Sequence, residues 1–243
     1  MSRPIHEQES GATVGGRSMD ISVIVPVLNE DSTIGFTLKA LLGLAPDEII
    51  VVDGGSEDKT REVCARLGVE VLHSARGRAR QMNLGARHAT GDVLLFLHAD
   101  TRLPYSAFAD IAEALDDPRC VGGRFDIELE GSQRMLRVIG RMISYRSRLS
   151  KVGTGDQAIF VRREVFERLG GYPEIPLMED IAFCRALKRV GRIACLRSKV
   201  VSSARRWERD GVWRTILRMW ILKLLYLMGV PPARLKRYYA DTR

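Results

Sequence analysis

The chain has 243 residues, of which 45% are hydrophobic and 28% are charged, and its formal net charge is +8. One large α/β domain fits this length better than two small ones, and the composition is that of an ordinary globular protein. The four cysteines form no C-x-x-C pair and have no nearby histidine, so neither a zinc site nor a disulfide framework is expected. The positive charge indicates an anionic partner: phosphate, nucleic acid or acidic lipid.

Residues 1–18 are polar, rich in glycine and serine, and without hydrophobic periodicity, which predicts a disordered leader. This region also lacks the apolar stretch of a secretory signal. Together with the cysteine usage, these features favour a cytoplasmic protein.

Residues 19–103 alternate between strand and helix patterns. Short apolar runs predict strands at 21–28, 48–52, 69–72 and 92–97. Helices are expected between them: the first follows the capping candidates Asp31 and Ser32, the second stops at Gly68, and the third covers 77–89. This alternation predicts a parallel sheet covered by helices.

Residues 104–203 mix the two patterns and complete a single domain of residues 19–203. The remaining strand patterns lie at 120–130, 157–161 and 192–202, and the remaining helical patterns at 133–150, 163–169 and 179–190. The expected fold class is therefore α/β, with one Rossmann-like, mostly parallel sheet flanked by helices.

The last segment, 204–243, is a basic tail around a strongly apolar helix at 212–228. Arg214, Arg218 and Lys223 interrupt this helix, so it lacks the long uncharged stretch of a membrane span. The amphipathic C-terminal helix is expected to cover the core, to lie at a membrane surface, or to do both with different faces.

Polar segments follow three of the predicted strands, at 26–30, 53–56 and 98–101. Because ligands of open parallel sheets bind beyond the carboxyl ends of the strands, these segments predict the site. Asp53 precedes two glycines, where a carboxylate can accept hydrogen bonds from a ribose or a base. The same pattern is typical of a tight turn with capping acids, and it does not match the G-x-G-x-x-G fingerprint.

Two further pairs carry possible chemistry. Strand alternation places the side chains of His98 and Asp100 on the same side, where Asp100 can hold Mg²⁺ or Mn²⁺ or simply cap the turn before Leu103. Glu179 and Asp180 open a predicted helix. Acids in this position often do no more than interact favourably with the helix dipole, but such a carboxylate can also take a proton from an acceptor hydroxyl.

Four arginines crowd the segment before the fourth strand: Arg76, Arg78, Arg80 and Arg87. Guanidinium groups suit phosphate recognition, although any one of them can equally face solvent. Aromatic residues are not interleaved with this basic run, so nucleic acid is not the expected partner.

An ordered set of motifs resembles family-2 glycosyltransferases from Met19 to about Leu196. The motifs are P-V-L-N-E at 26–30, V-V-D-G-G-S-E-D-K-T at 51–60, G-D-V-L-L-F-L-H-A-D at 91–100, G-D-Q-A-I-F-V-R-R-E-V-F-E-R-L-G-G-Y at 155–172 and M-E-D at 178–180. The compact length and the H-A-D variant look most like the bacterial subgroup of radical-SAM/selenodomain-associated transferases. The resemblance implies a GT-A fold, with a nucleotide half at about 19–103 and an acceptor half at about 104–203.

The resemblance also implies roles for the matching residues. The nucleotide-sugar site would comprise Pro26, Asn29, Glu30, Asp53, Ser56, Arg80, Asn83 and His98. Asp100 matches the metal-binding acid, Asp180 the catalytic base, and Glu179 its neighbour near the acceptor. Weaker matches to acceptor elements are Asp156, Gln157, Arg206 and Trp207.

Two departures from the family pattern concern the metal. His98 stands where the first acid of the D-x-D motif is expected, and no histidine follows it, whereas many relatives use a late histidine as a metal ligand. In addition, S-A-R-R-W at 203–207 is similar to the Q-x-x-R-W motif of processive synthases but lacks its glutamine, so a processive enzyme is not expected.

The resulting prediction is an inverting transfer, assisted by Mg²⁺ or Mn²⁺, of a sugar from a UDP- or GDP-sugar to a lipid or small-molecule acceptor. A peripheral contact with the inner face of the membrane is included. The alternatives are a sugar-phosphate nucleotidyltransferase, which would release pyrophosphate, and a non-catalytic module that binds anionic lipid or nucleic acid.

Overall fold

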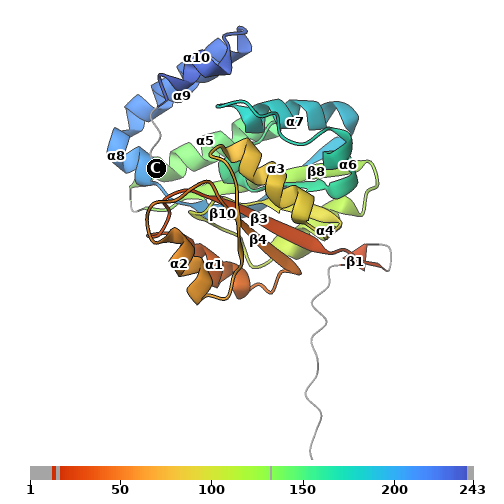
Figure 1. Cartoon of the computed structure of the whole chain (residues 1–243). Coiled ribbons are helices and arrows are strands. Elements are labelled where there is room, and N and C mark those ends of the chain that lie inside the picture. The colour runs from red at the N-terminus through yellow and green to blue at the C-terminus, as the bar shows by residue number, and fades with distance from the viewer. Residues whose placement is uncertain (1–12, 15–16, 132, 240–243) are drawn as a thin grey trace, which may run out of the picture.

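The computed structural model describes residues 13–14, 17–131 and 133–239 (Figure 1). Of the leader predicted at 1–18, strands β1 (Thr13–Val14) and β2 (Arg17–Ser18) fall within these ranges, and they pair antiparallel. The rest of that leader lies outside the described residues.

An eight-stranded sheet in the order β5-β4-β3-β6-β9-β8-β10-β7 forms the centre of the described chain. Its strands are β3 (Ile21–Val27), β4 (Glu48–Asp53), β5 (Val71–His73), β6 (Val93–Phe96), β7 (Thr101–Arg102), β8 (Cys120–Leu129), β9 (Ile159–Arg162) and β10 (Arg192–Ser202). Strands β5, β4, β3 and β6 are parallel neighbours, and β10 is parallel to β8. Strand β9 lies antiparallel between β6 and β8, and β7 is antiparallel to β10. The sheet is mixed and mostly parallel, as predicted.

Helices cover both faces of the sheet and enclose two apolar cores (Figure 1). The helices on one face are α1 (Ile34–Leu42), α2 (Thr60–Arg66), α4 (Ala107–Leu115) and α5 (Arg134–Ser150). Those on the other face are α3 (Arg78–His88), α6 (Arg163–Arg168) and α7 (Glu179–Val190).

Strand β3 shows why the predicted strands contain apolar runs without polar alternation. Val23 and Val25 belong to the core under α1, whereas Ile24 belongs to the core under α3, and all three are fully buried. A strand that is buried on both faces has no solvent side on which to alternate polar residues. Gly85 lets α3 lie close to this strand, because a Cβ there would be 2.5 Å from Cγ2 of Ile24.

Most predicted elements are present, and α7 and β10 have the predicted bounds. Helix α4 and the short strand β7 were not predicted. Leu42, the last residue of α1, is 43% exposed and lies off the face that buries Ile34, Leu38 and Leu41. Thr37 is buried in that helix and donates a hydrogen bond to the carbonyl of Ala99 at 2.7 Å, which ties α1 to the segment after β6.

The C-terminal segment forms α8 (Arg205–Asp210), α9 (Val212–Leu227) and α10 (Pro232–Lys236), which rise beside α5 and α7 (Figure 1). Leu222 and Leu235 are buried and join the core under α3, so the segment packs on the domain. Within the described ranges, no helix is long and apolar enough to cross a membrane.

Candidate functional site

A cleft of about 1490 Å³ opens at one edge of the sheet. Its inner wall consists of the segments that follow β3 and β6, the one-turn helix η1 (Gly155–Gln157) before β9, and the start of α7. Helices α8 and α9 contribute the outer wall. Because β9 runs antiparallel, its beginning lies at the same edge as the ends of β3 and β6. The cleft therefore occupies the ligand-binding edge expected for such a sheet.

Glu30, Asp100 and Arg205 form one charged cluster in this cleft. The buried carboxylate of Glu30 accepts hydrogen bonds from Oγ1 of Thr33 at 2.7 Å and from Nη2 of Arg205 at 2.8 Å. The same Nη2 lies 3.4 Å from Oδ2 of Asp100. Burial lowers the pKa of Arg205, but its hydrogen bond with Glu30 and the charges of Glu30 and Asp100 outweigh this effect and raise it. Arg205 thus bridges two acids from different loops.

Arg205 was not among the predicted site residues. The only sequence signal was the S-A-R-R-W segment, and it drew attention to the next residue, Arg206. The side chain of Arg206 lies outside the part of the chain whose side chains are described.

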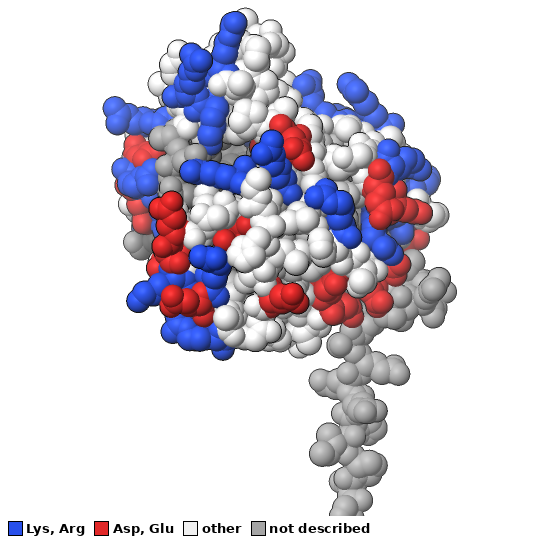
Figure 2. Space-filling view, viewed as in Figure 1, with Lys and Arg blue, Asp and Glu red and all other residues white. Residues whose placement is uncertain are grey.

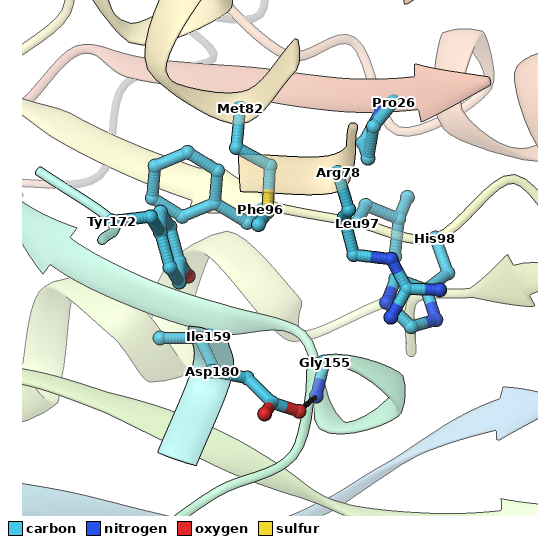
Figure 3. A pocket seen from close by; sticks show the side chains of 10 residues that line it. All are labelled: Pro26, Arg78, Met82, Phe96, Leu97, His98, Gly155, Ile159, Tyr172 and Asp180. Carbon is cyan, nitrogen blue, oxygen red and sulfur yellow. Dashed lines mark hydrogen bonds between the residues drawn. The ribbon is translucent and has the colours of Figure 1, made fainter. Parts of the chain in front are cut away.

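His98 lines the inner end of the cleft, where η1 approaches it very closely (Figure 3). A Cβ on Gly155 would stand 2.5 Å from Nε2 of His98, so only glycine fits there without a shift. The backbone N–H of Gly155 then donates to Oδ2 of Asp180 at 2.8 Å. His98 and Asp180 are thereby held on either side of one glycine, while His98 and Asp100 line the same cleft.

Asp180 lies at the N-terminus of α7, and its Oδ1 accepts a hydrogen bond from the N–H of Ile181 at 2.7 Å. Burial and the negative charge of Glu179 raise the pKa of Asp180 to about 6, against the opposing effects of the Gly155 N–H and of Arg78. Nη1 of Arg78 is 3.7 Å from Oε1 of Glu179. A carboxylate with a pKa near neutrality is suited to general base catalysis.

Asp53 and its neighbours form a compact turn that does not line the cleft. The buried carboxylate of Asp53 accepts hydrogen bonds from the N–H of Ser56 at 3.0 and 3.1 Å and from its hydroxyl. The Ser56 hydroxyl in turn accepts the N–H of Asn29 at 2.9 Å, and Asn29 has a left-handed backbone with φ 52°. These three residues join the loops after β3 and β4. Pro26 lines the inner pocket beside His98 (Figure 3).

Helix α3 presents Arg78 and Arg80 to the cleft, and Arg76 lies just before it. Nε of Arg80 is paired with Oε2 of Glu174 at 3.0 Å, across the cleft mouth. Asn83, predicted beside them, does not line the cleft. Its amide bonds both backbone groups of Tyr172, donating to the carbonyl at 2.8 Å and accepting the N–H at 2.9 Å. Asn83 therefore holds the loop that leads toward α7.

Some of the predicted acceptor residues line the cleft and others do not. Asp156 and Trp207 line the cleft, on η1 and α8 respectively. Gln157 is fully buried, and its Nε2 donates to the carbonyl of Phe125 at 3.1 Å and to the hydroxyl of Ser147 at 3.0 Å. Gln157 thus anchors η1 from below rather than facing a ligand.

A divalent cation would find few protein ligands in this cleft. Among the described residues, no group of three or more His, Cys, Asp or Glu side chains is arranged to hold a metal ion. Asp100 offers one partly exposed carboxylate next to Arg205, with His98 on the same wall. Because Mg²⁺ is commonly bound through one or two carboxylates plus substrate phosphates, these residues fit a cation whose coordination a bound diphosphate completes.

Basic side chains dominate around the cleft. In the view of Figure 2, Lys and Arg side chains gather over α8, α9 and α10. The arginines that line the cleft are Arg76, Arg78, Arg80, Arg146, Arg205 and Arg209. Such a concentration of guanidinium groups favours a phosphorylated ligand.

The chain is similar to a known protein family and to individual known proteins. The model of the family described as "Glycosyl transferase family 2" matches residues 22–170. Glucosyl-3-phosphoglycerate synthase of Mycolicibacterium smegmatis is 34% identical over 103 residues, which are 37% of this chain and 33% of that protein. The chain thus spans about a third of the length of this curated relative.

Two solved structures share the architecture. Glucosyl-3-phosphoglycerate synthase from Mycobacterium tuberculosis, in complex with Mn²⁺, UDP and glucosyl-3-phosphoglycerate, has a TM-score of 0.62 at 21% identity and covers 88% of this chain and 81% of that chain. A mannosyltransferase from Pyrobaculum calidifontis, in complex with GDP-Man and Mn²⁺, has a TM-score of 0.60 at 22% identity and covers 81% of this chain and 60% of that one. At these identities the likeness concerns the fold.

Proposed function

The chain belongs to glycosyl transferase family 2 and has the predicted GT-A fold, and from this premise we propose that it transfers a sugar from a nucleoside diphosphate sugar to a hydroxyl of an acceptor. The observation that carries the proposal is the position of Asp180, a carboxylate of raised pKa, in the same cleft as Asp100 and several arginines. A base and a set of phosphate-binding groups thus face one space.

The donor would occupy the inner part of the cleft. Asp100 would hold Mg²⁺ or Mn²⁺ together with the donor's diphosphate, and the cation would neutralise charge on the leaving diphosphate. Arg78 and Arg80 provide further positive charge on the same wall. The Mn²⁺ in the two solved glycosyltransferase structures supports this reading, as do the UDP in one and the GDP-Man in the other.

The nucleoside would lie against the loop after β3, which the loop after β4 supports from behind. Their residues Pro26, Asn29, Glu30, Asp53 and Ser56 match the family's nucleotide elements. The hydrogen bonds that join Asn29, Ser56 and Asp53 support a role in shaping this wall. Arg205, which bonds Glu30 and lies beside Asp100, would connect the nucleotide wall with the cation.

Asp180 would act as the base in an inverting displacement. Its carboxylate would accept the proton of the acceptor hydroxyl as that oxygen bonds to the anomeric carbon and the bond to the diphosphate breaks. Glu179 raises the pKa of Asp180, and the Gly155 N–H fixes one carboxylate oxygen. We also propose that the H-A-D motif assigns the chain to the radical-SAM/selenodomain-associated subgroup.

The same proposal includes a contact between the protein and the inner face of the membrane. Helix α9 exposes a second apolar stripe away from the cleft, formed by Trp213, Leu217 and Ile221, with Met228 just after the helix and Arg214 next to Trp213 in sequence. Tryptophan and basic residues on an amphipathic helix suit the headgroup region. In a flotation assay with phosphatidylglycerol vesicles, the protein should be recovered in the lipid fraction. The variant W213S/L217S should be recovered in the fraction without lipid.

Calorimetry with UDP- and GDP-sugars, with and without Mn²⁺, tests the proposed donor. Binding of one donor that strengthens at least tenfold with Mn²⁺ and is lost in D100A is the expected result. The products distinguish the alternative enzyme, because glycosyl transfer releases a nucleoside diphosphate whereas a nucleotidyltransferase releases pyrophosphate. The proposal fails if no nucleotide sugar binds while anionic vesicles or DNA do.

A further inference from the structure

The outer part of the cleft has apolar walls that the donor does not need. Two helices face it, α5 on the domain and α9 on the C-terminal segment. The apolar side chains that line it include Met142, Tyr145, Leu149, Met219, Trp220 and Leu224. On α5 they recur at intervals of three and four residues. On α9, Leu224 follows Trp220 by four residues and Met219 adjoins Trp220, so each set lies on one face of its helix.

These apolar side chains are well exposed. Met142 is 53% exposed, Leu149 69%, Trp220 63% and Leu224 59%. Continuous apolar surface of this kind is uncommon on a soluble domain and marks a binding surface. Because both helices line the same cleft, an apolar chain bound there would contact both of them.

Two cations are placed within these apolar walls. Arg146 lies on α5 and Lys223 on α9, and both side chains line the cleft. Nε and Nη2 of Arg146 are buried and have no hydrogen-bond acceptor among the described residues. A buried guanidinium without an acceptor is costly, so this position calls for an anionic ligand.

Lys223 faces the same space. Burial and the positive charge of Arg146 lower the pKa of Lys223 to about 8, the charge of Arg185 adds to this, and Asp180 acts in the opposite direction. The ammonium group is therefore near both Arg146 and the proposed base. Neither Arg146 nor Lys223 forms an ion pair within the described part of the chain, so a bound anion would relieve the repulsion between them.

From this juxtaposition we infer that the outer cleft binds the acceptor, and that the acceptor is a lipid with a phosphate in its head group. Arg146 and Lys223 hold the phosphate beside Asp180, and the apolar faces of α5 and α9 cover the chain. Two positive charges match a phosphate group, and guanidinium is suited to its geometry. The inference rests on the proposed function, since it names the acceptor of that reaction.

Binding of octyl phosphate to the full chain tests this inference without any donor. Calorimetry below the critical micelle concentration should show octyl phosphate binding at least tenfold more tightly than octanol and than inorganic phosphate. Affinity should rise from hexyl to decyl phosphate, by up to about fourfold per buried methylene group. In L224Q, which keeps both cations, this dependence on chain length should weaken.

The double variant R146Q/K223Q should bind octyl phosphate at least tenfold more weakly. Its matched control is R137Q/R141Q, which removes two positive charges from exposed positions of α5 outside the cleft and should bind as the wild type does. Circular dichroism and thermal unfolding of every variant report its folding. Should the double variant not fold, the single variants R146Q and K223Q should each show part of the loss.

Several outcomes overturn the inference. If octyl phosphate binds no better than octanol, the cleft has no phosphate site. If octyl phosphate binds no better than inorganic phosphate, the alkyl chain is not recognised and the ligand is not a lipid. Undiminished affinity in folded R146Q/K223Q removes these two residues. Donor binding is measured separately with UDP-glucose, GDP-mannose and Mn²⁺: if R146Q/K223Q loses it, the two cations belong to the donor site. If neither donor binds the wild type but octyl phosphate does, the proposed function fails and the lipid site stands.

Discussion

Replacing Asp180 by asparagine should make the protein more stable at pH 8 and nearly inactive. The pKa of this carboxyl rises from an ordinary 3.8 to about 6 on folding, chiefly because of burial and then because of Glu179. The folded state therefore holds the proton more tightly than the unfolded chain. Between pH 3.8 and about pH 6 the free energy of unfolding must fall as pH rises, because the ionised form of Asp180 is disfavoured in the folded protein.

The size of the effect follows from the shift. Each pKa unit corresponds to 1.36 kcal/mol, so ionised Asp180 lowers the free energy of unfolding by up to about 3 kcal/mol above pH 6. Asparagine has no charge and keeps one oxygen for the Gly155 N–H. We expect the variant to gain about 1–3 kcal/mol over the wild type at pH 8, and this difference to shrink toward pH 4.

Urea unfolding of both proteins at several pH values between 4.5 and 8 measures this difference. The matched control is E164Q, since Glu164 is an exposed acid in the first turn of α6. A constant difference between wild type and variant across this range would refute the electrostatic reasoning. Turnover should fall by about 10²–10⁴-fold in D180N with donor affinity nearly unchanged, which separates a base from a donor contact.

In the wild type, kcat/KM should also rise about tenfold per pH unit below about pH 6 and then level off, because the base must be ionised.

Three other substitutions address the remaining parts of the site. In R205Q the carboxylates of Glu30 and Asp100 lose the guanidinium that they share. The affinity for Mn²⁺ without nucleotide, measured by electron paramagnetic resonance, should therefore increase several-fold; an unchanged affinity would mean that Arg205 does not influence the Mn²⁺ site. In G155A the new methyl group meets His98, and kinetics should show at least a tenfold loss of turnover while thermal unfolding changes little; normal turnover would mean that this contact yields freely. In N83A two hydrogen bonds to Tyr172 are lost, and urea unfolding should show a loss of about 1–3 kcal/mol with donor affinity kept; the reverse pattern would favour a diphosphate contact.

The sequence was most informative where burial alone determines structure. Strand β3 carries an apolar run from Val23 to Val25 because both of its faces are covered, and α7 and β10 were predicted with their observed bounds. The direction of β9 was not predicted, since an apolar run of four residues carries no information about which neighbours it pairs with. The family motifs led to Asp100 and Asp180, and the structure places both in one cleft.

The missed site residues depend on long-range contacts. Arg205 meets Glu30 across 175 positions of the chain, and no local pattern announces such a pair. Arg146 and Lys223 read as ordinary basic residues of two amphipathic helices until the fold brings the helices to one cleft. Asn83 and Gln157 illustrate the converse case, because polar residues within motifs can bond to backbone and hold loops instead of ligands.

The antiparallel strand β9 has a consequence for how the protein moves. It is hydrogen-bonded to β6 on one side and to β8 on the other, so the strands before and after residue 104 share one uninterrupted ladder. Two halves joined in this way cannot swing apart as rigid bodies about a hinge without breaking that ladder. Any widening of the cleft that keeps this ladder intact has to come from its outer wall, to which α8 and α9 contribute.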